Sequence, residues 1–270
     1  MKIAYVGAAP KSAEEVERRG RLLQQWAASG TTIEMAYATE GPASIESMYE
    51  EYIAIPQYAK NMVRLEREGF AAAIVGCAGD PGIDAYRELC TNMLVVGPGM
   101  SGFHAAALLG RKFTLLTVAD SMIASSYELI QKSGLASSVA SVLAVNIPVL
   151  ELSHNRTHTL EKLVRIGRDA IEKDRADVLV LGCMSMAFLQ VAEDMQKQLG
   201  IPVINPAKAA LKLAESLVSC GLKQSKIMMG ECSNEYHLQK HGKNAAGRNQ
   251  FGCFKGYPGK VQHAGSRILQ

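Results

Sequence analysis

The stretch AAAIVGCAGDPG at residues 71–82 has a counterpart in ADVLVLGCMSMA at residues 176–187. Each is a short apolar run that ends in Gly-Cys and leads at once into a predicted helix start. Continuous apolar runs of this length are typical of buried strands in a parallel sheet. Ligands bind just beyond the carboxyl ends of such strands. The repeat therefore predicts two cysteines, Cys77 and Cys183, that face a single cleft.

Apolar runs alternate with helical patterns over most of the chain. We expect strands at 2–6, 32–37, 72–75, 93–96, 112–118, 141–147, 177–181 and 202–204. The helical patterns lie near 12–28, 44–68, 82–90, 101–109, 121–133, 158–175, 185–199 and 206–220. This alternation is typical of an α/β fold, in which helices cover both faces of a parallel sheet.

The two halves of the chain correspond in the order of their strands. KIAYV opens the first half and KFTLLTV the second, and the Gly-Cys strand comes third in each. We therefore expect two pseudo-symmetric lobes, 1–111 and 112–205, each a four-stranded parallel sheet flanked by helices, with the active site in the cleft between them. The helix at 206–225 is a candidate to return to the first lobe. Residues 228–270 are expected to form a loosely ordered, basic, Gly-rich tail.

The composition is that of a soluble globular protein and excludes several function classes. Hydrophobic residues make up 48% and charged residues 20% of the chain, but no apolar run approaches the roughly 18 residues of a membrane span. The N-terminus lacks a signal-peptide pattern. The net charge of +3 arises in the tail, without an aromatic-interleaved basic patch. We expect a cytoplasmic protein that acts on a small molecule and binds neither nucleic acid nor membrane.

The six cysteines are scattered and form no CxxC pair, so we expect free thiols. We interpret Cys90 and Cys220, which fall in helical patterns, as small buried hydrophobic residues. The tail contains four conceivable metal ligands, Cys232, His237, His241 and Cys253. Their spacing matches no familiar zinc pattern, so we predict no metal.

Two opposed thiols suit racemisation at a carbon acid. A thiolate removes the proton from one face, and a thiol opposite returns a proton to the other face. Each cysteine is expected to face the N-terminus of the following helix, which favours its thiolate. The developing enolate also needs hydrogen-bond donors. We therefore assign Cys77 and Cys183 as the catalytic pair.

The other candidate site residues are those expected at the same rim. They include backbone N–H groups after each cysteine, the loop GAAP at 7–10 and the end of the fifth strand. Asp80 is also expected to cap the helix that Pro81 opens. The candidate substrate-binding residues are Ala8, Pro10, Ala78, Gly79, Asp80, Thr117, Val118, Met184 and Ser185. We expect no Arg or Lys at this rim.

GPGMSG at residues 97–102 matches the dinucleotide fingerprint GxGxxG. It follows a strand and opens a helix, and Asp120 lies 18 residues beyond its last glycine, where a ribose-binding acid belongs. However, the motif follows the fourth strand rather than the first, and its helix is short. We therefore predict no cofactor, although the loop remains compatible with a phosphate-sized anion.

Several segments resemble the hydantoin/allantoin racemase branch of the aspartate/glutamate racemase superfamily. They are IVGCAGDPGIDAYREL (74–89), VVGPGMSGFHAAALLGRKFTLLTV (95–118), LVLGCMSM (179–186) and IPVINPAKAALKLAESLV (201–218). The resemblance covers about residues 1–227. It implies a two-lobed α/β fold and a homo-oligomer. It also implies cofactor-independent racemisation of a 5-substituted hydantoin or of allantoin by Cys77 and Cys183.

The chain departs from that branch at three places. GAAP replaces an Asn-Pro-Asn type of loop, Met100 stands where an acidic residue is common, and the sequence after Lys226 is unlike the family's ending. Aspartate and glutamate racemases tend to carry Asn-Thr after the first cysteine and Thr after the second. Ala78-Gly79 and Met184 occupy those places here, which favours a neutral cyclic amide over an amino acid.

Two alternatives remain open. One is other superfamily chemistry, either an aspartate- or glutamate-type amino-acid racemase, or a dicarboxylate decarboxylase or isomerase with a single essential cysteine. The expected lack of Arg and Lys at the rim speaks against a dicarboxylate. The other alternative is a two-lobed protein that binds a small molecule without catalysis.

Overall fold

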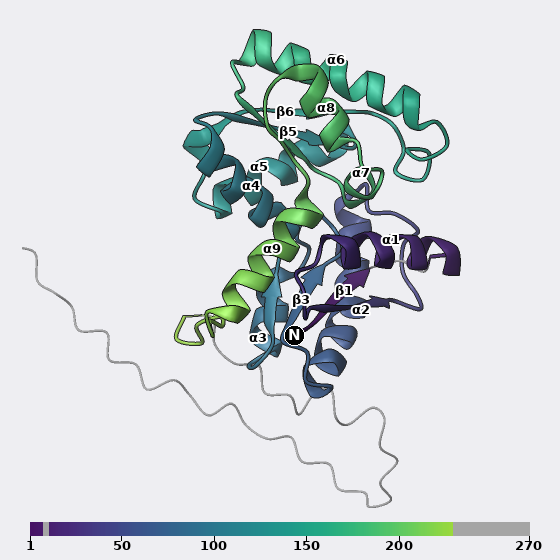
Figure 1. The fold of residues 1–270 in the computed structure, drawn as a ribbon, viewed down its shortest axis with the longest axis vertical. Helices are drawn as coiled ribbons and strands as arrows, with labels where there is room; N and C mark the ends of the chain where they lie inside the picture. Colours follow the sequence, from purple (N-terminus) through teal and green to yellow (C-terminus); the bar gives the residue numbers. More distant parts are fainter. Residues whose placement is uncertain (8–10, 229–270) are drawn as a thin grey trace, which may run out of the picture. The chain divides into compact units, whose positions relative to one another are not determined.

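The computed structural model describes residues 1–7 and 11–228, which contain two four-stranded parallel sheets (Figure 1). The first sheet has the order β2-β1-β3-β4 and the second the order β6-β5-β7-β8. The strands are β1 (Lys2–Gly7), β2 (Thr32–Tyr37), β3 (Ala72–Val75), β4 (Leu94–Val96), β5 (Phe113–Thr117), β6 (Val139–Ala144), β7 (Val178–Leu181) and β8 (Val203–Ile204). The matching order of the two sheets confirms the predicted α/β fold. The expectations for Ala8, Pro10, the tail and its conceivable metal ligands fall outside the described residues.

Helices connect the strands and cover the sheets. They are α1 (Ala13–Trp26), α2 (Met48–Arg67), α3 (Ile83–Leu89), α4 (Pro98–Leu109), α5 (Ile123–Lys132), α6 (Arg156–Asp174), α7 (Met184–Phe188), α8 (Ala192–Leu199) and α9 (Pro206–Ser219). The helix predicted at 185–199 is divided into α7 and α8. The reason is Gln190, whose φ of +56° places it in the left-handed region and interrupts the helix. None of the described helices is long and apolar enough to cross a membrane.

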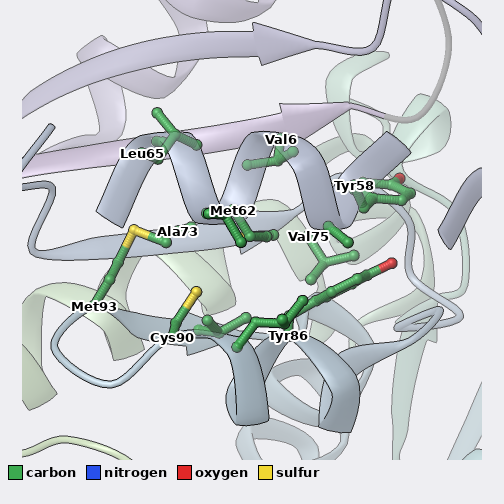
Figure 2. Packing of buried hydrophobic residues seen from close by; sticks show 14 of the residues in the cluster. Val6, Tyr58, Met62, Leu65, Ala73, Val75, Tyr86, Cys90 and Met93 are labelled. Carbon is green, nitrogen blue, oxygen red and sulfur yellow. The ribbon is translucent and has the colours of Figure 1, made fainter. Parts of the chain in front are cut away.

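The first sheet separates two layers of hydrophobic core. Along β1 and β3, alternate side chains point to opposite faces. Val6, Ala73 and Val75 pack against α2 and α3 on one face (Figure 2). On the other face, Ile3 and Ile74 pack in a cluster that also contains residues of α1, α7 and α9. The structure thus buries both faces of the strand that precedes Cys77.

The helix α9 begins next to the second sheet and packs on the first. The buried Asn205 side chain caps it, accepting from the N–H groups of Ala207 and Lys208 and donating to the carbonyl oxygen of Ala187. From there α9 packs against β3 and β4 of the first sheet (Figure 1). Cys90 is buried in the first core, as predicted. Cys220, in contrast, is exposed, because it lies just beyond the last turn of α9.

Candidate functional site

The Gly-Cys segments of the two lobes make equivalent backbone hydrogen bonds. The N–H of Gly76 donates to the carbonyl oxygen of Val6 at 2.7 Å, and the N–H of Gly182 donates to that of Leu116 at 2.8 Å. Each bond extends the pairing of the two central strands by one residue beyond β3 or β7. The next residue in each lobe is the cysteine. Both thiols therefore stand at the carboxyl ends of the central strands, where the strand order reverses and ligands bind.

Both cysteines line one cavity of about 430 Å³ to which the two lobes contribute. The structure brings into the same lining every described residue that the sequence nominated, namely Cys77, Ala78, Gly79, Asp80, Thr117, Val118, Cys183, Met184 and Ser185. Gly7, the described part of the GAAP loop, also lines the cavity. In residues 1–7 and 11–228, no group of three His, Cys, Asp or Glu side chains is placed to hold a metal ion.

The Cys77 thiol has acidic neighbours and one hydrogen-bond donor. Burial raises its pKa, the N–H of Gly79 lowers it, and Glu51, Cys183 and Asp80 raise it further. The expectation that a helix begins directly after this cysteine is wrong. The helix α3 begins only at Ile83, because the turn at residues 78–82 carries two left-handed residues, Asp80 and Gly82.

The Cys183 thiol lies at the start of α7, as predicted, and is buried. Burial raises its pKa, whereas the N–H groups of Met186 and Ser185, the charge of Arg19 and the Ser185 hydroxyl lower it. Contrary to expectation, the pKa of both thiols is raised, because burial outweighs the donors and the charge that lower it. The Cys183 sulfur also disfavours ionisation of Cys77, so the arrangement disfavours the state in which both thiols are ionised.

Asp80 does not cap the helix that follows it, contrary to expectation. Its carboxylate oxygens accept from the N–H groups of Gly99 and Met100, both at 2.8 Å, and so cap α4. The residue has a φ of +52° and is buried. Burial raises the pKa of Asp80 to about 7, although the two N–H groups and the charge of Arg87 act to lower it. Asp80 therefore ties the turn after Cys77 to the start of α4.

This carboxylate also explains the GPGMSG motif. A side chain at Gly97 would overlap the carboxylate of Asp80, and one at Gly99 would overlap the carbonyl oxygen of Ala78. The glycines thus allow α4 to pack against the turn after Cys77. The Asp80 carboxylate occupies the helix N-terminus where a phosphate would bind. Asp120 instead exchanges two hydrogen bonds with Asn146, at 3.1 and 3.2 Å.

The expectation of a rim without Arg or Lys is wrong, because Lys11, Arg19 and Lys132 line the cavity. Arg19 comes from α1, whose buried residues are Arg19, Leu22 and Leu23. An arginine at helical spacing with two buried leucines is the signal that sequence reasoning missed. Lys132 forms an ion pair with Asp84 at 2.5 Å, a contact between the two lobes. Glu51 and Glu128, from α2 and α5, line the cavity as well.

We predict that Asp80→Asn lowers the free energy of unfolding by about 1–3 kcal/mol at pH 5, because an amide cannot accept both N–H groups. Asparagine tolerates a positive φ, so backbone strain does not change. The folded-state pKa is raised from 3.8 to about 7, so the stabilising contribution of Asp80 falls as pH rises from about 4 to about 7. The loss caused by Asp80→Asn should therefore be larger at pH 5 than at pH 8. Urea denaturation measures both values.

Asp84→Asn is the matched control for this prediction. Asp84 lies four residues away, is exposed, and pairs with Lys132 and with the partly buried Arg87. Its replacement should change the free energy of unfolding by less than about 1 kcal/mol. Equal effects of the two substitutions, or a larger loss at pH 8 than at pH 5 for Asp80→Asn, contradict the role given to Asp80.

The fold and the site together define a class of protein, in which two related α/β lobes each contribute a thiol to one shared cavity. Residues 8–214 match the family model described as Asp/Glu/Hydantoin racemase. The chain is 35% identical over 201 residues to a hydantoin racemase of Pseudomonas sp. (strain NS671), covering 74% of this chain and 80% of that protein. The chain therefore belongs to the Asp/Glu/hydantoin racemase family, a family of isomerases, as the resemblance in sequence predicted.

Two solved structures extend the comparison. Allantoin racemase from Klebsiella pneumoniae has a TM-score of 0.80 at 28% identity, over 86% of this chain and 94% of that one. Allantoin racemase from Pseudomonas fluorescens has a TM-score of 0.78 at 29% identity, over 92% of this chain and 100% of that one. These proteins share the two-lobed architecture described above.

Proposed function

We propose that this protein is a cofactor-independent racemase that transfers a proton between Cys77, Cys183 and a cyclic amide carbon acid. The substrate class is a 5-substituted hydantoin or allantoin. The observation that carries the proposal is the single cavity lined by both thiols, which come from equivalent positions in the two lobes. The names of the similar proteins support the same substrate class.

The proton balance of the reaction requires one thiolate and one thiol. The thiolate takes the proton from C5, and the electron pair of the C–H bond moves into the adjacent carbonyl group as an enolate. The opposite thiol then donates its proton to the other face of C5. The product has the inverted configuration, and the two sulfurs have exchanged protonation states. Two neighbouring thiols that disfavour joint ionisation suit this balance, because a doubly ionised pair has no proton left to return to C5.

A neutral ring fits the cavity better than a dicarboxylate does. Arg19 is already paired with Glu15, and Lys11 donates to the carbonyl oxygen of Ala43 at 3.2 Å. The carboxyl groups of Glu51, Asp80 and Glu128 lie in the same lining and repel a dianion. The volume of about 430 Å³ lies in the range of small-molecule sites and leaves room for a C5 substituent beside the ring.

The test is a screen of single enantiomers in deuterium oxide. Racemisation is followed by polarimetry, and deuterium at C5 is followed by NMR or mass spectrometry. We expect loss of rotation together with deuterium incorporation for allantoin or a 5-substituted hydantoin, well above the uncatalysed rate without protein. Turnover of aspartate, glutamate or an arylmalonate instead supports the other superfamily chemistry. Thermal stabilisation by a hydantoin without any proton exchange supports a binding protein and contradicts the proposal.

A further inference from the structure

The charges around the two thiols differ. Arg19 is buried, and its Nη2 donates to Ser185 Oγ at 3.3 Å. Its guanidinium carbon lies 4.8 Å from the centroid of the Phe188 ring. Ser185 and Phe188 both belong to α7, the helix that begins directly after Cys183. These contacts hold a cation from the first lobe beside the cysteine of the second lobe.

The acid that pairs with Arg19 does not cancel this charge. Glu15 accepts from Arg19 Nε at 2.6 Å and from Arg18 Nε at 2.7 Å, so two cations share one carboxylate. Burial opposes ionisation of Glu15, but its bonds to Arg18 and Arg19 lower its pKa to about 2. Lys11, a second basic residue of the cavity lining, is half-buried. Burial and the charge of Arg19 lower its pKa, although Glu15 and Cys183 act to raise it. The groups that face Cys183 thus carry net positive charge.

The groups that face Cys77 carry negative charge. Glu51 Oε2 lies 3.4 Å, and Cys77 Sγ 3.7 Å, from the point where a Cβ on Gly79 would stand. The carboxylate and the sulfur therefore flank one small backbone position. Burial and the nearby Glu128 raise the pKa of Glu51. Asp80 is a second acid near Cys77, and the phenol groups of Tyr58 and Tyr86 add no cation.

We propose that Cys183 ionises more readily than Cys77 and is the first of the two to act as the base, and that Arg19 is the positioning residue that sets this order. An opposite charge nearby favours the ionised form of a group, and a like charge disfavours it. The inference deepens the proposed function and rests on it for the meaning of the thiol pair. When one of the two thiols is ionised, the cavity accepts a proton on its Cys183 side and donates one from its Cys77 side.

The test measures alkylation of each thiol by iodoacetamide as a function of pH, with peptide mapping by mass spectrometry. Only the thiolate reacts, so the midpoint of each profile reports ionisation, whatever the access of the reagent to each sulfur. We expect the Cys183 midpoint to lie about one pH unit or more below the Cys77 midpoint, which is about a tenfold difference in thiolate fraction. Equal midpoints, or a lower midpoint for Cys77, overturn the proposal.

Variants of Arg19 test its role. Arg19→Gln should raise the Cys183 midpoint by about one pH unit and leave the Cys77 midpoint in place. Arg19→Lys keeps the charge and should restore most of the shift, which a purely structural role does not predict. Arg18→Gln is the matched comparison: Arg18 also pairs with Glu15 but bonds to the carbonyl oxygen of Phe188 rather than to Ser185, so its loss should move the Cys183 midpoint less than the loss of Arg19 does. An unmoved Cys183 midpoint in folded Arg19→Gln protein overturns the proposal.

A second variant covers the case in which Arg19→Gln does not fold. Glu51→Gln removes the negative charge beside Cys77 and should lower the Cys77 midpoint without moving that of Cys183. An unchanged Cys77 midpoint overturns the proposal. Alkylation requires no substrate, so the two proposals can fail separately. If the Cys183 midpoint lies below the Cys77 midpoint but the protein has no racemase activity, only the proposed function is refuted. If the protein is an active racemase but the Cys77 midpoint is the lower one, only this inference is refuted.

Discussion

Cys77→Ser and Cys183→Ser should each lower the rate of racemisation by about 10²–10⁴-fold, the usual contribution of a general acid or base. A serine hydroxyl is far less acidic than a thiol, so the variant keeps the shape of the side chain and loses one proton carrier. The cavity, both Gly-Cys turns and the second thiol remain in place. The measurement is the initial rate of loss of optical rotation with a substrate found in the screen described above.

Deuterium incorporation separates the two variants. With one thiol left, the protein can remove the C5 proton of one enantiomer and return deuterium to the same face without inversion. We expect each variant to exchange one enantiomer faster than the other, with opposite preferences for the two variants. Cys220→Ser is the control, because Cys220 is exposed and outside the cavity lining. Full racemase activity in the Cys77→Ser, Cys183→Ser double variant contradicts the mechanism.

The sequence was sufficient to predict the fold because its signals are local. β3 matches its predicted limits, since a continuous apolar run with breaks at both ends marks a buried parallel strand. β2 also matches its predicted limits, although it is an edge strand with partly exposed side chains. The convergence of both cysteines and the residues after them also follows from the fold. Parallel strands place their carboxyl ends at one edge of a sheet, and the structure finds these residues in one cavity lining.

The features that sequence reasoning missed depend on contacts between distant segments. Asp80 has the sequence context of a local cap, but it bonds to N–H groups 19 and 20 residues further along the chain. Arg19 enters the cavity only because α1 packs near α7, which lies 166 residues further along at Ser185. Helical periodicity places an arginine on a buried face, but it does not reveal which lobe supplies the other wall of its pocket.

The second large effect is expected from replacing the glycine that precedes each cysteine. A Cβ on Gly76 would lie 2.5 Å from the carbonyl oxygen of Val6 and 2.9 Å from Cα of Gly7, both in the backbone of β1. Neither atom can move without breaking the sheet, and the Gly76 N–H already bonds to that same oxygen. Gly76→Ala should therefore lower the free energy of unfolding by about 3 kcal/mol, the upper part of the range for overpacking. It should also displace Cys77 and reduce activity in any protein that folds.

Gly182→Ala repeats the change at the equivalent position of the second lobe and should have the smaller effect. There the nearest atom, the carbonyl oxygen of Leu116, lies 2.8 Å from the Cβ position. Gly20→Ala is the control, because its nearest neighbour is the flexible side chain of Met35 and alanine favours the helix by up to about 1 kcal/mol. Urea denaturation of the three variants gives the ranking. If Gly76→Ala is as stable as Gly20→Ala, then the close approach of backbones that places Cys77 does not exist, and the equivalence of the two Gly-Cys segments rests on sequence alone.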